Sequence, residues 1–245
     1  MKAIAFHLQK GGVGKTTLSG TMAYDASLKG KTIIVDCDPQ GNASSWFLTE
    51  FTHELADVLT GKLYVKDAII NICPDLDILP TFGLEGELKL YGETKLFQEP
   101  FSFCDLFGEL EKLGYKYVIA DLSPGIGQLE KTVLIACNEV ITPLTPEYFS
   151  LDGIEIFNSE IKKLEKTMRK SPKHDMLILN AFDARIKQHV EIADSTKNLN
   201  YKIITIPVDP VFRKAQAAHT SPQIFGGMKS ITEDAIRMIG GLLWR

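Results

Sequence analysis

Two lysines, three glycines and two threonines lie within residues 7–17, HLQKGGVGKTT. Glycine permits backbone angles and close approaches that a side chain would block, so the main-chain N–H groups of such a loop can converge on a phosphate group. Lys15 would bring a positive charge to the β- and γ-phosphate oxygens, and Thr16 a hydroxyl ligand to Mg²⁺. The segment predicts a nucleoside triphosphate site formed by Gly11, Gly12, Val13, Gly14, Lys15, Thr16 and Thr17, with Thr17 at the α-phosphate.

Carboxylates follow two apolar runs further along the chain. Asp36 and Asp38 flank Cys37 after TIIVD, and Asp121 ends YVIAD. An aspartate after a strand is commonly only a turn former, so a metal-binding role depends on its order among the other motifs. Asp36 and Asp38 would project from a strand end in different directions, so we expect them to have different roles.

Short apolar runs that alternate with longer amphipathic stretches must position these side chains. The runs are nearly continuous in Ile, Val and Leu, which is typical of parallel strands covered on both faces. We expect strands at residues 3–8, 32–36, 76–80, 117–121, 139–144, 176–180 and 202–207. We expect helices at residues 16–29, 54–60, 104–113, 127–136, 150–170, 186–198 and 230–243. This alternation predicts one α/β domain over residues 1–245, with a doubly wound, mostly parallel sheet and helices on both faces.

Residues 81–103 are less regular and predict a short helix and a loop. The glycine-rich loop would follow the first strand and open the first helix, which is the setting that a P-loop requires. The first strand begins close to Met1, so we expect no helix-turn-helix domain before it.

Composition excludes several classes of protein. The sequence has no apolar run of the roughly 18–20 residues that a membrane span needs, no signal-peptide pattern, and four scattered cysteines without a CxxC pair. Its net charge is −4, but residues 151–245 hold 15 basic and 11 acidic side chains, a balance of +4. A basic half can bind a polyanion, although a solvated helix face would also explain it.

The loop departs from the standard GxxxxGK[ST] pattern, because Gln9 stands where glycine would be and the sequence reads KGGVGKT. This is the deviant Walker A motif, and the chain resembles the ParA/MinD family of dimerising ATPases. The segments IIVDCDPQGNAS (33–44), YVIADLSPGIG (117–127) and ITPLTPEYFSLDGI (141–154) are similar to further motifs of that family, in the same order. Two departures are DLSP in place of the more usual DTPP, and Leu8 where asparagine is common.

The resemblance implies ATP and Mg²⁺ as cofactors and assigns roles to individual residues. Lys10 would reach across an ATP-sandwich homodimer, so that each subunit supplies a positive charge to the phosphates of the nucleotide bound by the other. Lys15 would serve its own subunit's nucleotide. Asp38 would position the attacking water and contact the metal through water, Asp36 would lie further from the metal, and Asp121 would hold Mg²⁺ together with Thr16.

Two other regions complete the implied site. Pro124, Gly125 and Gly127 would belong to a loop that responds to the γ-phosphate. Asn180 would contact the adenine edge, and Pro207 and Asp209 would form the other side of that pocket. For each of these, a plain turn residue is the alternative interpretation.

Within the family, the sequence favours the partition branch. MinD-like proteins end in a basic amphipathic membrane helix, whereas the polar face of residues 230–243 is not cationic, which indicates a helix packed on the sheet. DNA contacts are expected at Arg185, Lys187, Arg213 and Lys214, with a weaker basic run at 162–173.

We therefore expect a cytoplasmic, nucleoid-associated ATPase that partitions plasmid or chromosomal DNA. It would bind DNA non-specifically as an ATP dimer, and a centromere-binding partner protein would stimulate hydrolysis; no membrane association is expected. The alternatives are a MinD-like or cargo-positioning ATPase acting on a membrane or non-DNA cargo, and a small-molecule ligase built on the same loop.

Overall fold

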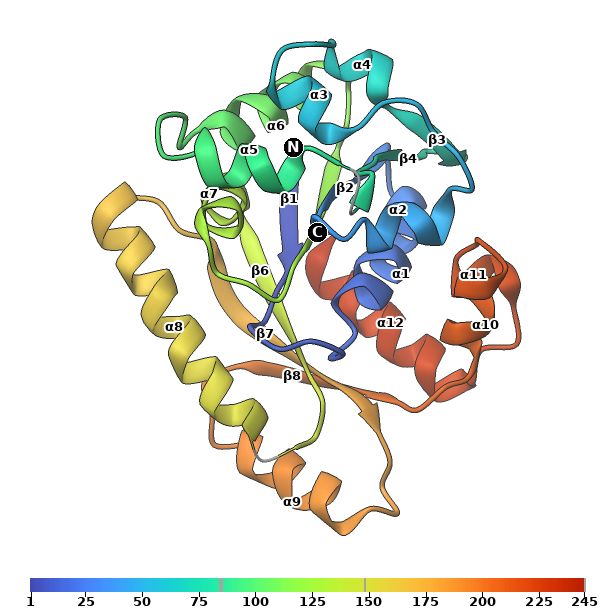
Figure 1. The fold of residues 1–245 in the computed structure, drawn as a ribbon. Helices are drawn as coiled ribbons and strands as arrows, with labels where there is room; N and C mark the ends of the chain where they lie inside the picture. Colours follow the sequence, from blue (N-terminus) through green and yellow to red (C-terminus); the bar gives the residue numbers. More distant parts are fainter. Residues whose placement is uncertain (84–85, 148, 245) are drawn as a thin grey trace.

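The computed structural model describes residues 1–83, 86–147 and 149–244. At its centre is an eight-stranded sheet in the order β3-β4-β2-β5-β1-β6-β7-β8 (Figure 1). The strands are β1 (Lys2–Phe6), β2 (Thr32–Cys37), β3 (Ile70–Cys73), β4 (Leu76–Leu79), β5 (Tyr117–Leu122), β6 (Glu139–Leu144), β7 (Lys173–Phe182) and β8 (Lys202–Pro207). All neighbouring strands are parallel except β3 and β4. The predicted doubly wound, mostly parallel sheet is confirmed.

Helices cover both faces of this sheet (Figure 1). One face carries α1 (Lys15–Ser27), α2 (Asn42–Phe47), α10 (Val211–Ala217) and α12 (Ser230–Leu243). The other carries α3 (Leu55–Leu59), α5 (Leu88–Thr94), α6 (Ser102–Lys112), α7 (Gln128–Ala136) and α8 (Phe149–Met168). Side chains of the central strands alternate between the two resulting cores: Ile4 and Ile34 pack on one side, Ala5 and Val35 on the other.

Several elements differ from the sequence-based prediction. The antiparallel strand β3 and the helices α2, α4 (Val65–Ala68), α10 and α11 (Pro222–Phe225) were not predicted, because segments of four to seven residues are too short to show a helical period. The first strand ends at Phe6 rather than at residue 8, and β7 extends beyond 176–180 at both ends. The irregular segment 81–103 contains α5 and the start of α6, and its residues 84–85 lie outside the described part.

The last helix, α12, packs on the sheet as the sequence indicated. Ala235, Ile236, Ile239 and Leu243 are buried in the core beside α1 and β8. None of the described helices is both long enough and apolar enough to cross a membrane. α9 (Lys187–Thr196) lies at the far end of the sheet, beside the last strands (Figure 1).

Candidate nucleotide site

The glycine-rich loop and both carboxylate segments meet at the carboxyl edge of the central strands. Asp36 on β2 and Phe6 on β1 each lie in register with Asp121 on β5, because the three strands are parallel neighbours. Ligands of open α/β sheets bind at this edge. A cavity of 380 Å³ opens there, lined by Gly11, Gly12, Gly14, Lys15, Thr16, Thr17, Asp38, Gln40, Asn42 and Pro124.

The backbone of the loop has the conformation that its glycines were expected to permit. Gly12 and Gly14 have φ angles of +74° and +95°, in the left-handed region. A Cβ atom on Gly14 would lie 2.1 Å from Asn180 Nδ2, whereas a Cβ on Gly11 or Gly12 would meet nothing within 4 Å. The loop therefore presents bare backbone to the cavity and leads into the N-terminus of α1, where helix N–H groups favour an anion.

Lys15 lies inside this site. Its side chain is buried, and Nζ donates hydrogen bonds to the carbonyl oxygens of Lys10 (2.9 Å) and Leu8 (3.3 Å). Burial lowers the pKa of Lys15, while the charges of Asp121 and Asp38 raise it. The ammonium group is thus held at the cavity wall by the loop's own carbonyls, within the field of two carboxylates.

Asp121 offers an oxygen that fits a metal site. Its Oδ1 accepts a hydrogen bond from Ser19 Oγ (2.9 Å), but Oδ2 is buried and has no hydrogen-bond partner among the described residues. Burial raises the pKa of Asp121, and a hydrogen bond from the Thr16 hydroxyl opposes that shift. A buried carboxylate oxygen without a partner beside a threonine hydroxyl is suited to a hydrated Mg²⁺ ion, which prefers oxygen ligands.

The two aspartates of the 33–44 segment occupy different environments. Asp36 is fully buried and accepts hydrogen bonds from Ser44 N (2.7 Å), Ser44 Oγ (2.6 Å) and Asp38 N (3.3 Å), so it braces the loop that follows β2. Burial raises the pKa of Asp36. Asp38 lines the cavity, and its Oδ1 accepts a hydrogen bond from Gln40 N (2.9 Å). Of the two carboxylates, Asp38 is the one that can reach a bound ligand.

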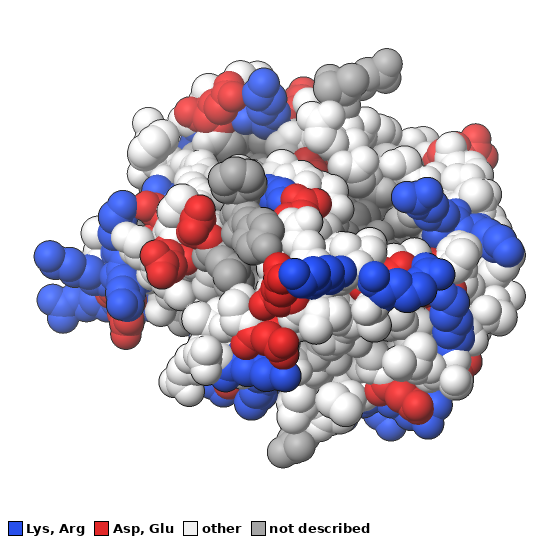
Figure 2. Space-filling view, turned by 90° about the horizontal axis from the view of Figure 1, so that it is seen from below, with Lys and Arg blue, Asp and Glu red and all other residues white. Residues whose placement is uncertain are grey.

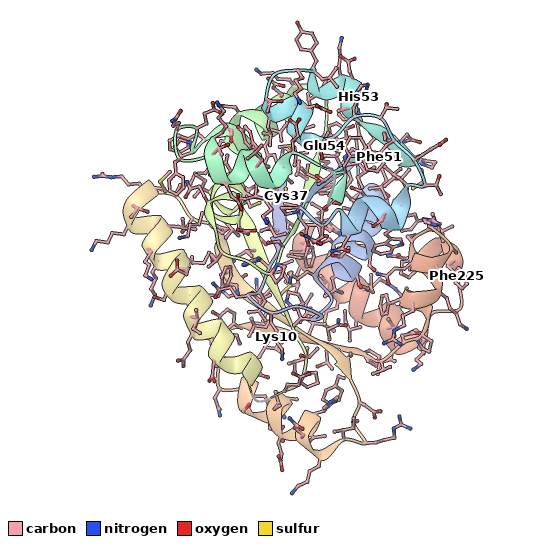
Figure 3. The ribbon with its side chains drawn as sticks, viewed as in Figure 1. Lys10, Cys37, Phe51, His53, Glu54 and Phe225 are labelled. Atoms are coloured by element: carbon pink, nitrogen blue, oxygen red, sulfur yellow. The ribbon has the colours of Figure 1, made fainter. Side chains whose placement is uncertain are left out.

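Lys10 is placed differently from Lys15. It is absent from the described residues that line the cavity, and its side chain is 32% exposed. Nζ contacts Glu147 Oε2 (2.5 Å) and Thr145 Oγ1 (3.5 Å), on the connection between β6 and α8. Figure 3 shows Lys10 on the connection between β1 and α1. The hydrogen bond from Lys10 lowers the pKa of Glu147.

The residues predicted for the adenine pocket have roles within the fold. Asn180 Nδ2 donates to Val13 O (2.9 Å) and so ties β7 to the loop. Pro207 ends β8. Asp209 accepts hydrogen bonds from Val211 N (3.1 Å), Lys229 N (2.9 Å) and Thr232 Oγ1 (2.9 Å), which joins α10 to α12. Their contacts with adenine stay predictions.

Sequence reasoning missed some residues at the site. Gln40 and Asn42 line the cavity, and their place in the DCDPQGN segment was a usable signal. Gln216 on α10 donates from Nε2 to Thr17 Oγ1 (3.1 Å), across 199 positions of sequence, and no local pattern indicated it. His7 is fully buried beside Phe157, with ring centroids 5.0 Å apart, and neither of its ring nitrogens has a hydrogen-bond partner among the described residues.

The four predicted DNA-contacting residues form two pairs at separate places. Arg185 makes hydrogen bonds from Nε (2.9 Å) and Nη2 (2.6 Å) to Asp183, and Lys187 lies 3.3 Å from Glu191. Arg213 and Lys214 are exposed on α10, and neither joins an ion pair among the described residues. Figure 2 shows the face of the molecule seen from below the view of Figure 1. On that face the basic side chains lie in separate groups, with acidic side chains between them.

A glycine-rich loop joins the first strand to the first helix, and its Lys15 and Thr16 line one cavity together with Asp38, while Asp121 lies near the end of the neighbouring strand β5. This arrangement defines a P-loop nucleoside triphosphatase. A protein-family model described as an AAA domain matches residues 1–174. A protein of Borreliella burgdorferi called BBD21 is 39% identical over 219 residues, 88% of this chain and 89% of its own. The sporulation initiation inhibitor protein Soj of Bacillus subtilis is 31% identical over 204 residues, 80% of this chain and 79% of its own.

Solved structures agree with this classification. Apo McdA of Cyanothece superposes with a TM-score of 0.87 at 17% identity over 99% of both chains. The septum site-determining protein MinD of Pyrococcus horikoshii, complexed with Mg-ADP, gives a TM-score of 0.80 at 21% identity over 98% of this chain and 94% of its own. The chain belongs to the ParA/Soj family of partition ATPases.

Proposed function

We propose that this chain is a partition ATPase that works by ATP-dependent pairing. Two copies bind ATP and Mg²⁺ and close on each other with the nucleotides between them. The pair binds DNA without sequence preference in the cytoplasm, on the nucleoid. A partner protein on a centromere-like site stimulates hydrolysis and so releases the pair. Residues 1–245 act as one ATPase domain, which carries the nucleotide site and the DNA contacts together.

The observation that carries this proposal is the separation of the two lysines. Lys15 is buried at the wall of its own cavity, and Lys10 lies outside that cavity with a partly exposed side chain. A lysine in this place can meet the phosphates of a second copy without displacing its own subunit's cation. A positive charge there stabilises the charge of the transferring phosphoryl group.

The residues present can hold the nucleotide and its metal. The N–H groups of the loop and Lys15 would bind the phosphates, and Thr16, Asp38 and Asp121 would hold Mg²⁺ directly or through water. Bound Mg²⁺ supplies positive charge to the phosphate oxygens. The MinD structure of the same fold, which is complexed with Mg-ADP, supports the binding of a nucleotide and a magnesium ion.

Asp38 is the residue placed to act on the attacking water. It lines the cavity, and its Oδ1 and Oδ2 lie within reach of Gln40 N and Asn42 Nδ2, which fix its orientation. A carboxylate held in this way can orient a water molecule and accept its proton. We expect Asp38→Ala to bind ATP normally and to lose hydrolysis.

For DNA, the better candidates are Arg213 and Lys214. Their charges are exposed and uncompensated by ion pairs in the described structure, whereas Arg185 and Lys187 each contact a carboxylate. α10 is also the helix whose Gln216 contacts Thr17, so it lies directly beside the nucleotide site. Phosphate contacts by such residues should make binding strongly dependent on salt.

The test compares DNA binding by the wild-type protein, the Arg213→Glu/Lys214→Glu variant and a Lys66→Glu/Lys112→Glu control. The control makes the same change of charge at exposed lysines of α4 and α6. We expect the wild type and the control to bind DNA only in the presence of ATP. Each should have the same affinity for two unrelated duplexes, and that affinity should fall steeply as the salt concentration rises. The α10 variant should still pair with ATP but bind DNA at least about tenfold more weakly.

Three results would contradict the proposal: DNA binding that is independent of ATP, a strong preference for one duplex, or equal losses in the α10 variant and the control. ATP-dependent binding to anionic vesicles in place of DNA would instead favour the MinD-like alternative.

A further inference from the structure

We infer that Ser123 and Glu130 form a clamp that holds the loop 123–127 beside the nucleotide cavity in the position needed for hydrolysis, so that Glu130 is a positioning residue. This inference rests on the proposed function. The loop begins two residues after Asp121, and its Pro124 lines the nucleotide cavity. Any shift of the loop therefore changes the wall that faces the triphosphate.

Both oxygens of the Glu130 carboxylate are bound to this loop. Oε2 accepts a hydrogen bond from Gly127 N (2.7 Å), and Oε1 accepts one from the Ser123 hydroxyl. Ser123 Oγ in turn accepts a hydrogen bond from Gly125 N (3.1 Å). Glu130 is only 6% exposed, and its two hydrogen bonds to the loop are partly buried, whereas the bond between Gly125 and Ser123 is exposed. Three of the five loop residues are thus tied, directly or through Ser123, to one carboxylate on α7.

Close packing fixes only part of the loop, because Ile126 packs against the core while open space lies beside Pro124 and Gly127. Pro124 lines the nucleotide cavity, while Gly127 and Glu130 line a second cavity of 340 Å³ between α5 and α7. Pro39, which follows Asp38, lines the same second cavity. The ends of the loop beside the cavities have little steric restraint, so hydrogen bonds position them.

The simpler role of Glu130 is to cap α7. A glutamate at the third helical position commonly accepts a hydrogen bond from the N–H of the N-cap residue, here Gly127. The cap uses only Oε2. The bond from Ser123 uses the other oxygen and adds nothing to the cap, so it serves the loop. Replacing Ser123 removes the clamp and leaves the cap intact, which separates the two roles.

The chemistry gives a reason for a fixed loop. Hydrolysis requires the water, the phosphate and the residues around them to be aligned, and small displacements lower the rate more than they lower binding. The N–H groups of the 11–14 loop and Lys15 would supply most contacts to the ground-state phosphates, so release of the 123–127 loop should affect turnover rather than ATP affinity.

The experiment compares the wild type with Ser123→Ala, Ser123→Thr, Glu130→Gln and the control Glu54→Gln. Glu54 is an equivalent buried carboxylate that accepts hydrogen bonds from Phe82 N (2.9 Å) and Glu87 N (2.7 Å), outside the nucleotide cavity. For each protein, ATP affinity is measured by calorimetry, hydrolysis by single turnover at saturating ATP and Mg²⁺, and folding by thermal melting.

We expect Ser123→Ala and Glu130→Gln to lower the single-turnover rate by about tenfold or more while ATP affinity stays within about twofold. Ser123→Thr, which keeps the hydroxyl, should restore the rate. Glu54→Gln should lower the melting temperature and leave the rate unchanged.

Two results would overturn the clamp: an unchanged rate in Ser123→Ala, or a loss of rate that Ser123→Thr does not restore. A wild-type protein that neither binds nor hydrolyses ATP would contradict the proposed function itself, and the clamp with it.

Discussion

Two identical side chains five positions apart take different environments because the backbone between them turns. The left-handed Gly12 and Gly14 bring Lys15 under the loop, where carbonyl oxygens hold its ammonium group, and leave Lys10 outside against Glu147. The difference in burial predicts a difference in function. A cation inside the cavity contributes to binding, and a cation outside it contributes only when a second molecule arrives.

At this scale, Lys15→Ala should weaken ATP binding by at least about tenfold, because a hydrogen bond between charged groups contributes about 1.5–3 kcal/mol. Lys10→Ala is the matched control, since it removes the same charge from the same loop outside the cavity. Calorimetry with ATP and Mg²⁺ should show near-normal affinity for the Lys10 variant. Equal losses in the two variants would show that the loop has been assigned wrongly.

His7 adds a pH dependence to folding. Burial lowers its pKa to about 3, so the unfolded chain binds a proton near pH 6.5 that the folded chain does not. Its contribution to stability is therefore complete above pH 6.5 and is lost as the pH falls toward 3. Between pH 7 and 5 the expected loss is about 2 kcal/mol.

His7→Phe should remove that part of the acid sensitivity while keeping the contact with Phe157. Denaturant unfolding of both proteins at pH 7 and pH 5 measures the difference. His174, whose pKa burial lowers to about 4, remains in both proteins, so its effect cancels. An equal loss of stability in both proteins would mean that His7 is not neutral in the fold.

At the scale of elements, α10 is a helix that the sequence did not indicate and that lies beside the site. It has seven residues, which is too short for a helical pattern, yet it carries Gln216 and the exposed pair Arg213 and Lys214. Asp209 accepts one hydrogen bond from Val211 N of α10 and two from Lys229 N and Thr232 Oγ1 at the start of α12. The residue predicted to contact adenine thus has a structural role in joining two helices.

Asp209→Ala should therefore destabilise the fold by about 2–4 kcal/mol, since three hydrogen bonds of about 1 kcal/mol each are lost and buried donors are left unpaired. Thermal melting tests this structural role, and normal stability of the variant would contradict it. Competition binding of ATP and GTP tests the predicted contact with adenine, which a lowered preference for ATP would support.

For the molecule as a whole, the features that could be predicted were those marked by strong local patterns in the sequence. Continuous Ile and Val runs gave the parallel strands, because strands buried on both faces have no polar alternation, and the glycine spacing gave the phosphate loop. The antiparallel β3, four short helices and the Gln216–Thr17 contact depend on which segments meet in space. Ser123 stands out in sequence only as part of the DLSP departure, and Glu130 does not stand out, since the turn between them sets their partnership.

The distribution of charge on the molecule favours contact with a polyanion at a few places on the surface rather than over one large basic face. The net charge is −4, and the basic groups are separated by acidic ones (Figure 2). Pairing would place the exposed cations of two copies, such as Arg213 and Lys214, on one assembly. Pairing is accordingly the step on which the proposed function depends most.

The most direct test is the mass of the protein in solution, measured by light scattering with ADP and with a non-hydrolysable ATP analogue in the presence of Mg²⁺. One chain has a mass of 27.2 kDa. The wild type should give this value with ADP and twice this value with the analogue. Lys10→Ala should bind the analogue and still give the mass of one chain. A wild-type protein that keeps the mass of one chain when saturated with the analogue, or a Lys10→Ala variant that pairs as well as the wild type, would contradict ATP-dependent pairing through Lys10.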